Sequence, residues 1–504
     1  MHMQVAKMYA ATVVGLHAEI VEVEADINNG LPATIIVGLP DTSVQESKER
    51  VKSALKYAGF SFPTGRISVN LAPADLPKEG SHFDLPIALA ILTAAGSIPL
   101  QSPNNLFLGE LSLDGRLRPV AGVLACVLRA RASGYTHVFV PKANGQEAAL
   151  VSGVIVYGVD TLQELCAHLL GVKILEPSTI LLRPPADSRV VGVDFKDIAG
   201  QATAKRALEI ASSGGHNILM YGPPGSGKTL LARALAGILP DLTHEEIVEL
   251  TNIYSVAGKL HGGTVITARP VRSPHHTASS VSLVGGGTYP KPGEVTLAHR
   301  GVLFLDEFPE FSRSVLEVLR QPLEDGMVTV ARAKSTLTFP ASFILVAALN
   351  PCPCGYLGDT GRTCTCTPGD IQRYRKKLSG PLLDRIDLHI EVPRIPYEVL
   401  RRGIIAEPTA VVRKRVSQAR AVQYTRFGSS RTNSEMGVLE LEKFCGLAEA
   451  AEQLLKTAAD RFLLSARSIH RLLKVARTIA DLEASPEVQS QHIAESLQYR
   501  PKAE

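Results

Sequence analysis

The sequence has no apolar run long enough to cross a membrane. Its longest one, residues 85–96, is about half of the roughly 20 residues that a spanning helix needs. The first 15 residues, MHMQVAKMYAATVVG, also lack the cleavage pattern of a signal peptide. Internal repeats and long low-complexity tracts are absent as well. These absences argue against a helical membrane protein, and we expect a soluble, cytoplasmic protein without a membrane partner.

Cysteine is scarce, and the charges are nearly balanced. Seven cysteines are an odd number for a disulfide framework, and four of them crowd into residues 352–366. The net charge of +4 says little about partners. Between residues 371 and 430, however, 13 basic residues accompany 5 acidic ones. This excess favours an anionic partner, or an anionic nucleotide shared between subunits.

The length of 504 residues, 45% of them hydrophobic, is enough for several cores and predicts about three domains. Up to residue 172, stretches typical of strands alternate with helical stretches at 43–59, 84–95 and 123–133. This alternation predicts a self-contained α/β domain.

Three further segments follow this domain. Three prolines without helical periodicity predict a linker over residues 173–195. A nucleotide-binding core is expected over 196–393, and apolar periodicity near 3.6 residues predicts a helical bundle over 394–504.

The string GPPGSGKT at residues 222–229 fits the phosphate-loop pattern GxxxxGK[ST]. It follows a predicted buried strand, NILMY at 217–221, and precedes a predicted helix at 230–237. The glycines allow consecutive backbone N–H groups to surround a polyphosphate at the positive end of the helix. Lys228 supplies a charge to the β- and γ-phosphates, and Thr229 supplies a hydroxyl to Mg²⁺. The predicted ATP ligands in this loop are Gly222, Pro223, Pro224, Gly225, Ser226, Gly227, Lys228 and Thr229.

Two further strand ends carry polar residues. The string VLFLDE places Asp306 and Glu307 at the end of a predicted strand. Asp306 is predicted to bind ATP-bound Mg²⁺, and Glu307 to act as the catalytic base that activates water. A solvated turn explains such a pair when no phosphate loop precedes it. Asn350 ends the next strand and could orient the attacking water, although an Asn before proline is equally a turn residue.

The phosphate loop, the acidic strand end and the strand-end Asn occur in the order of AAA+ ATPases, which the chain resembles. GPLLDRIDLHIEVP at 380–393 is similar to the arginine-finger segment of magnesium-chelatase I subunits and minichromosome-maintenance helicases. The resemblance implies that Arg385 reaches the γ-phosphate of a neighbouring subunit in a ring or dimer. A surface ion pair is the alternative. SARSIHRLL at 465–473 resembles the sensor-2 helix, which implies Arg467 over the phosphates, with Arg471 as second choice.

Two insertions match the same branch of AAA+ proteins. Residues 258–293 resemble its helix-2 insertion, and His275 and His276 within them are expected to be polar loop residues rather than ligands. LEDGMVTVARAKSTLTFPAS predicts a β-hairpin with Arg332 and Lys334 at its basic tip. In helicases of the branch such tips grip phosphates, which implies DNA contacts for both residues. A solvated turn is the alternative.

CPCGYLGDTGRTCTC contains two CxC pairs separated by nine residues. Four thiolates at this spacing can surround Zn²⁺ as a tetrahedron, with each sulfur about 2.3 Å from the metal. We predict a structural zinc site, with free cysteines and redox disulfides as alternatives. The predicted ligands are Cys352, Cys354, Cys364 and Cys366.

Residues 71–92 and 108–130 resemble the two segments that carry the Ser–Lys dyad of Lon-type proteases. In register with that family, the nucleophile position falls on His82, with Ser81 one residue early, and the position of the lysine base falls on Leu124. A serine without a base is a poor nucleophile. We therefore expect a noncatalytic Lon-like domain with a role in binding or assembly, and no protease activity.

Together these features closely resemble the YifB/ComM family of magnesium-chelatase-like bacterial proteins. The fold expected is α/β, with a Lon-like domain, an AAA+ core with both insertions, and a helical lid. The resemblance implies a hexameric, ATP- and Mg²⁺-dependent DNA helicase that promotes branch migration of single-stranded DNA during natural transformation. The alternatives are a magnesium-chelatase motor subunit and a remodelling chaperone that acts on proteins.

Overall fold

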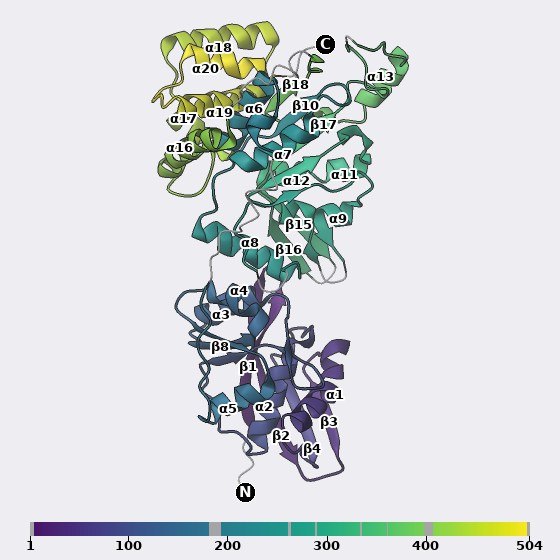
Figure 1. The fold of residues 1–504 in the computed structure, drawn as a ribbon, viewed down its shortest axis with the longest axis vertical. Coiled ribbons are helices and arrows are strands. Elements are labelled where there is room, and N and C mark those ends of the chain that lie inside the picture. Colours follow the sequence, from purple (N-terminus) through teal and green to yellow (C-terminus); the bar gives the residue numbers. More distant parts are fainter. Residues whose placement is uncertain are drawn as a thin grey trace. The chain divides into compact units, whose positions relative to one another are not determined.

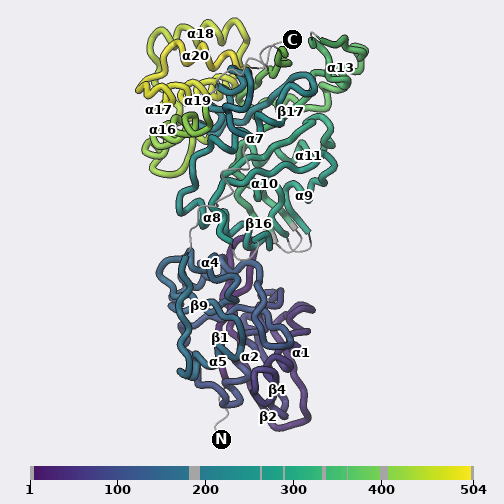
Figure 2. Tube along the Cα trace, viewed as in Figure 1, coloured from purple at the N-terminus to yellow at the C-terminus, as the bar shows by residue number. Residues whose placement is uncertain are grey.

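The computed structural model describes residues 5–180, 193–260, 264–287, 290–332, 335–359, 361–397 and 407–500. Contacts divide the chain into two compact units (Figures 1 and 2). The first unit comprises Met1–Arg183 and Thr243–Thr267, and the second comprises Pro184–Leu242 and Ala268–Glu504. None of the helices that the structure describes combines the length and the apolar character needed to cross a bilayer.

A seven-stranded mixed sheet, in the order β3-β4-β2-β1-β5-β8-β9, forms the centre of the first unit. The pairs β1–β2 and β2–β4 are antiparallel, and the remaining neighbours are parallel. The strands are β1 (Ala6–Val14), β2 (His17–Asn28), β3 (Ala33–Val37), β4 (Arg66–Ala72), β5 (Asn105–Phe107), β8 (His137–Pro141) and β9 (Ile155–Val159). A separate pair is formed by β6 (Glu110–Leu111) and β7 (Leu117–Arg118).

Helices pack on this sheet. They are α1 (Thr42–Tyr57), α2 (Asp84–Ala94), α3 (Val123–Ala132), α4 (Gly145–Ala149) and α5 (Leu162–Leu169), with the 3₁₀ turn η1 (Ser81–Phe83) before α2. Residues 84–92 of α2 are all buried, as expected for a helix that is apolar on every side. The predicted helices at 43–59, 84–95 and 123–133 are confirmed to within two residues.

One helix of the first unit comes from the middle of the sequence. α8 (His244–Val256) contacts α3 and lies within the first unit. The Asn252 side chain donates to the Leu16 carbonyl at 3.0 Å, and the Gly122 N–H donates to the Ser255 carbonyl at 3.0 Å. The predicted domain boundaries place these residues in the 196–393 core, whereas their contacts group the helix with the first unit.

The second unit contains a parallel sheet of five strands in the order β11-β14-β17-β10-β18. In a parallel sheet the carboxyl ends of all strands lie at one edge, where ligands bind. The strands are β10 (Ile218–Tyr221), β11 (Val271–Arg272), β14 (Val302–Leu305), β17 (Ile344–Leu349) and β18 (Leu388–Glu391). β10, β14 and β17 confirm the three strands predicted before the polar residues.

Helices and a hairpin accompany this sheet. The predicted hairpin is confirmed, because β15 (Met327–Arg332) and β16 (Ser335–Pro340) pair antiparallel from Met327–Pro340 to Arg332–Ser335. The helices are α6 (Ala202–Gly214), α7 (Lys228–Ile238), α9 (Ser280–Val284), α10 (Glu294–Leu297), α11 (Arg313–Glu317), α12 (Arg320–Asp325), α13 (Pro368–Arg375) and α14 (Gly380–Leu383). Two short strands, β12 (Gly285–Gly286) and β13 (Lys291–Pro292), lie in the predicted helix-2 insertion.

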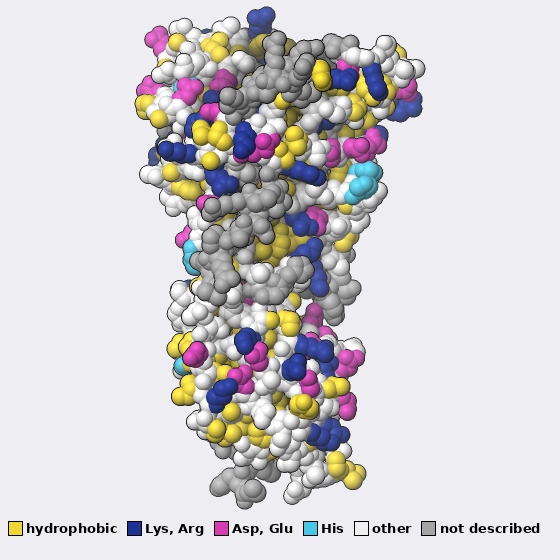
Figure 3. Space-filling view, in the orientation of Figure 1, with side chains coloured by type: hydrophobic (Ala, Val, Ile, Leu, Met, Phe, Trp, Pro, Cys, Tyr) yellow, Lys and Arg dark blue, Asp and Glu magenta, His cyan; other side chains and the backbone are white. Residues whose placement is uncertain are grey.

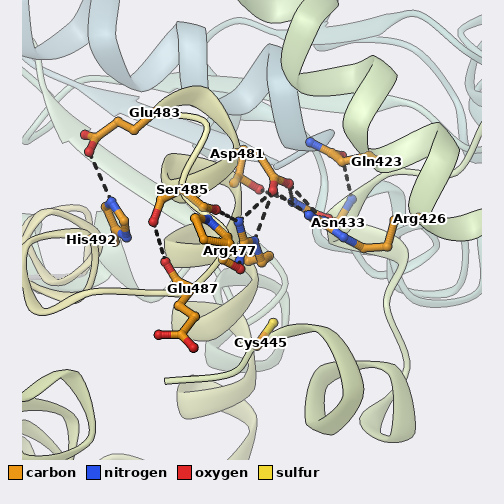
Figure 4. A network of polar contacts seen from close by, with 12 residues as sticks. Gln423, Arg426, Asn433, Cys445, Arg477, Asp481, Glu483, Ser485, Glu487 and His492 are labelled. Carbon is orange, nitrogen blue, oxygen red and sulfur yellow. Dashed lines mark hydrogen bonds and ion pairs between the residues drawn. The ribbon is translucent and has the colours of Figure 1, made fainter. Parts of the chain in front are cut away.

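The carboxyl-terminal part is helical, as predicted. Together with the two sheets and the helices that accompany them, it confirms the predicted α/β fold class. Its helices are α16 (Thr409–Phe427), α17 (Val438–Phe444), α18 (Glu449–Phe462), α19 (Ala466–Leu482) and α20 (Ser490–Gln498). A buried carboxylate, Asp481, organises its interior (Figure 4). Asp481 accepts from Arg426 at 2.9 Å, Arg477 at 3.0 Å and Asn433 at 2.8 Å. This network joins α16 and the turn after it to α19.

Candidate nucleotide site

The phosphate loop connects β10 to α7 and depends on glycine at three positions. Gly225 and Gly227 have φ angles of +75° and +93°, a conformation that glycine adopts without the penalty of other residues. A Cβ at either position would meet nothing within 4 Å, so the space beside both is open. At Gly222 a Cβ would instead lie 2.1 Å from the Val392 carbonyl oxygen, so close packing against the end of β18 requires glycine.

Lys228 lies at the centre of the loop. Its Nζ donates to the carbonyl oxygens of Gly222 at 2.8 Å and Pro223 at 2.9 Å, and to Oδ1 of Asn350 at 3.2 Å. Burial of the side chain lowers the pKa of its ammonium group. The structure thus brings together two predicted site residues, Lys228 at the start of α7 and Asn350 directly after β17.

Thr229, which follows Lys228 in the sequence, contacts Asp306 from the end of β14. The Thr229 hydroxyl donates to Oδ2 of Asp306 at 2.9 Å. A hydroxyl and a carboxylate are the oxygen ligands that Mg²⁺ prefers, and Mg²⁺ usually keeps waters and substrate phosphates as its remaining ligands. The chemistry of this pair therefore fits the predicted magnesium ion.

Glu307 follows Asp306 with a left-handed backbone, at φ +51°. Such a conformation is uncommon for a residue with a side chain and is concentrated at functional sites. The side chain is 56% exposed, and its Oε2 lies 3.5 Å from Nδ1 of His276. We expected His276 to be an ordinary polar loop residue, but it contacts the candidate catalytic base. Nothing in the sequence spacing of the two residues indicates this contact.

A cavity of about 520 Å³ opens beside the phosphate loop, a volume typical of small-molecule sites. Gln201 and Tyr221 line it from the amino-terminal side, and Glu391, Arg394 and Tyr499 contribute from β18 and the carboxyl-terminal end. Sequence reasoning missed this cavity, because its walls come from distant segments.

Gln201 also connects the cavity to the loop. Its Nε2 donates to the Ser226 carbonyl at 3.3 Å and to the Pro393 carbonyl at 2.8 Å. The segment before α6 is therefore part of the site, although no sequence motif marks it.

The two predicted transition-state arginines meet at one carboxylate. The Arg385 guanidinium, whose side chain is only 8% exposed, forms an ion pair with Glu324 at the end of α12. Nη2 of Arg467 lies 3.3 Å from the other oxygen of Glu324. Arg471, the second choice for the sensor role, instead pairs with Asp384 at 3.6 Å, and burial lowers the pKa of its guanidinium.

The four predicted zinc ligands also converge. Their sulfur atoms all lie within 4.8 Å of one another. Cys352 Sγ is 3.4 Å from Cys354 Sγ and 3.7 Å from Cys364 Sγ, and the latter two are 3.6 Å apart. The structure therefore contains a possible four-cysteine metal cluster.

The predicted DNA contacts can be followed only in part. Arg332 ends β15, but its side chain and all of Lys334 lie outside the described residues. On the face drawn in Figure 3, Lys and Arg side chains are interspersed with Asp and Glu side chains rather than gathered into one basic patch.

The three residues at the positions of the Lon dyad are either buried or hydrogen-bonded within the first unit. Leu124 is fully buried in the core of the first unit, and the Ser81 hydroxyl donates to Glu110. His82 is buried, its Nε2 lies 2.9 Å from the Ala11 carbonyl oxygen, and burial lowers its pKa to about 4.

The fold and the nucleotide site define a magnesium-chelatase-type protein of the AAA+ class. Residues 194–400 match the family model for magnesium chelatase subunit ChlI, residues 406–500 match its carboxyl-terminal model, and residues 23–144 match a third ChlI model. The chain is 44% identical to competence protein ComM of Haemophilus influenzae, with 99% of this chain and 98% of that protein covered. It is 43% identical to the uncharacterized protein YifB of Escherichia coli, with 99% and 97% covered. The chain therefore belongs to the YifB/ComM family.

A chelatase subunit is a more distant relative. The magnesium-chelatase 67 kDa subunit of Chlorobaculum tepidum is 30% identical over 194 residues, which are 37% of this chain and 28% of that protein.

Proposed function

We propose that the protein hydrolyses ATP and uses the energy to move DNA. The observation that supports hydrolysis is the convergence of Lys228, Thr229, Asp306 and Asn350 at the carboxyl edge of one parallel sheet. Lys228 binds the β- and γ-phosphates, Glu307 removes a proton from the attacking water, and Asn350 orients that water. Thr229 and Asp306 would hold Mg²⁺, which would supply positive charge next to the phosphates.

The cavity beside the loop accommodates the nucleoside in this proposal. Tyr221 leads directly into the phosphate loop and also lines the cavity, so a ligand can extend from one into the other. The mixed polar and aromatic lining, with Gln201 and Tyr499, suits a base and a ribose.

We infer that hydrolysis takes place between subunits of a six-membered ring, in which Arg385 reaches the γ-phosphate of the neighbouring subunit. Arg467 shares the carboxylate partner of Arg385, so both arginines would serve the same neighbouring nucleotide. Positive charge near the γ-phosphate stabilises the transition state of phosphoryl transfer.

The proposed substrate is DNA that is branched or single-stranded, and the proposed process is branch migration during natural transformation. The relative named competence protein, which matches over nearly its whole length, supports this choice. The β15–β16 hairpin would bring Arg332 and Lys334 to the phosphate backbone. A chelatase motor is less well supported, because similarity to the chelatase subunit covers 37% of the chain. No observation on the described residues favours a protein-remodelling chaperone.

Three further assignments accompany this function. We propose that the four cysteines hold a structural Zn²⁺, because their sulfur atoms are already gathered. The Lon-like unit is proposed to be noncatalytic, because Leu124 occupies the position of the lysine base and is part of the core. The proposed location is the cytoplasm.

The decisive experiment is ATP-dependent resolution of a labelled three- or four-strand DNA junction by the full chain. Lys228→Ala should abolish both nucleotide binding and resolution, whereas Glu307→Gln should retain binding and lose hydrolysis. The assay needs several salt concentrations, because phosphate contacts weaken steeply with ionic strength. If wild-type protein hydrolyses ATP but neither resolves junctions nor is stimulated by DNA at any salt concentration, the DNA part of the proposal is wrong.

A further inference from the structure

The spacing of the four sulfur atoms matches a tetrahedral metal site rather than disulfides. With Zn–S bonds of about 2.3 Å, the edges of a tetrahedron are about 3.8 Å long. The observed separations of 3.4, 3.6 and 3.7 Å are close to this edge. A disulfide needs sulfurs about 2.05 Å apart, well below these values.

Backbone groups support the same arrangement. The Cys354 N–H donates to the sulfur of Cys366 at 3.4 Å, and the backbone at Tyr356 and Thr365 hydrogen-bonds the sulfur of Cys354. N–H groups aimed at sulfur stabilise thiolates, which are the form that binds zinc. We call residues 352–366 the cysteine knuckle.

The cysteine knuckle packs directly against the phosphate loop. Gly355, at φ +84°, lies so close to Pro224 that a Cβ on it would be 2.6 Å from Cγ of the proline ring. The same Cβ would lie 3.8 Å from the side chain of Asn350. Gly358, at φ +78°, belongs to the same knuckle, but a Cβ there would meet nothing within 4 Å. One glycine therefore touches the nucleotide site, and the other does not.

Both ends of the cysteine knuckle are also tied to the site. At its start, Asn350 accepts from Lys228 and is two residues from the fully buried Cys352. After its end, Tyr374 on α13 hydrogen-bonds the backbone of Asn350. Lys377, just beyond α13, pairs at 3.1 Å with Glu310 in the turn that follows Glu307. The knuckle thus contacts the phosphate loop and the strand end at Asn350, and the segment that follows the knuckle contacts the turn after Glu307.

We propose that zinc in the cysteine knuckle braces the phosphate loop, so that the metal controls how tightly the protein binds ATP. The four thiolates and the metal hold Gly355 against Pro224, and this contact keeps the loop in the shape that receives phosphates. Without the metal, the three glycines leave the knuckle with more backbone freedom, and the support of Pro224 is lost. The inference rests on the proposed ATPase function and adds a dependence on zinc.

The test compares two glycine substitutions in the full chain. Both Gly355→Ala and Gly358→Ala place a Cβ on a left-handed backbone, so their local strain is matched, and only the first collides with Pro224. For each protein we would measure zinc per chain by elemental analysis, and the affinity for a fluorescent nonhydrolysable ATP analogue with Mg²⁺. Cys364→Ser and chelator-treated wild type report on loss of metal.

We expect wild type and both glycine variants to bind zinc. Gly355→Ala should bind the analogue about tenfold more weakly than Gly358→Ala. Cys364→Ser and the chelator-treated protein should lose zinc and bind the analogue more weakly, by a similar factor. Zinc returned to the chelated wild type should restore affinity.

Several outcomes would overturn the inference. Gently purified wild type without zinc would exclude the metal site, and equal affinity in Gly355→Ala and Gly358→Ala would exclude the brace. Unchanged affinity after zinc removal would do the same. These failures differ from failure of the proposed function, in which zinc-loaded wild type would not bind the analogue at all. The glycine pair remains informative even if Cys364→Ser does not fold.

Discussion

Glu324 is a single carboxylate that holds two guanidinium groups from distant parts of the chain. Arg385 follows α14 and Arg467 lies in the first turn of α19, yet both pair with Glu324 on α12. Charge-assisted hydrogen bonds of this kind fix the direction of a guanidinium as well as its position. In the proposed ring, the aim of both arginines at the neighbouring nucleotide depends on this residue.

Glu324→Gln should therefore lower the rate of ATP hydrolysis by about tenfold or more, since misplaced catalytic groups cost rate steeply. Affinity for the nonhydrolysable analogue should stay unchanged, because Glu324 is not in the phosphate loop. The measurement is steady-state ATPase together with nucleotide titration. Asp325→Asn removes the exposed carboxylate next in sequence and is the matched control. Equal rates in the two variants, or a faster Glu324→Gln, would contradict the positioning role.

His82 gives the first unit a dependence on pH. Burial lowers its pKa from 6.5 to about 4, so between these values the unfolded chain binds a proton that the folded unit does not. The contribution of His82 to stability is therefore lost as the pH falls through this window, by about 2 kcal/mol between pH 6.5 and 5. Burial raises the pKa of Asp84 to about 6, and this group acts in the opposite direction over nearly the same range.

The difference between wild type and His82→Gln isolates the histidine, because Asp84 is present in both. We expect the urea midpoint, followed by circular dichroism, to fall less in His82→Gln than in wild type when the pH is lowered from 7 to 5. His17→Gln, at an exposed histidine of β2, should behave as wild type. Parallel pH dependence in all three proteins would show that His82 is not buried as a neutral group.

The candidate site residues that belong to motifs were predictable from the sequence. The residues that contact and position them were not. Asp306 and Glu307 follow a buried apolar strand, Lys228 and Thr229 end a phosphate loop that follows another, and the topology of a parallel sheet then gathers them. Glu324 has no such marker, because its role arises from helices and loops that approach in space. Gln201 and His276 were missed for the same reason.

At the scale of elements, the periodicity of the sequence predicted regular helices and strands. It did not predict that α8 packs with the first unit. The helix lies between α7 and β14 in the sequence and has a capping box at Thr243. Its apolar residues Ile247 and Val248 pack against the core of the first unit. A helical period reveals that a face is apolar, but it does not reveal which core will cover that face.

A protein that begins at residue 193 should consequently be poorly soluble, because Ile247 and Val248 lose the core that covers them. Replacing both with Asp should restore solubility to the shortened protein. In the full chain the same double replacement should destabilise the first unit by about 2 kcal/mol or more. Size-exclusion chromatography and urea unfolding measure the two effects. A soluble shortened protein without the replacements would contradict the assignment of α8.

At the scale of the whole molecule, the proposed active site is shared. In this proposal Glu307 serves the nucleotide of its own subunit, whereas Arg385 serves that of a neighbour. A subunit that lacks one of these residues can therefore be complemented by a subunit that lacks the other.

Glu307→Gln and Arg385→Ala should each be inactive alone, and an equimolar mixture should regain about a quarter of wild-type ATPase activity if subunits assort at random. In that mixture, the intact base of one subunit faces the intact arginine of the next. Mixing Glu307→Gln with Lys228→Ala is the control, because both changes disable the subunit's own pocket and nothing is regained. An inactive Glu307→Gln and Arg385→Ala mixture that still forms mixed rings would contradict a shared site.

The division of the chain into units has a consequence for how this architecture can be taken apart. The backbone passes from one unit to the other three times, at residues 183–184, 242–243 and 267–268. A protease that nicks only the first passage should yield two fragments that still migrate together until denaturant is added. For the same reason, the amino-terminal part is not a simple appendage to the second unit. Its removal or replacement would also require changes to residues 243–267, which pack with it.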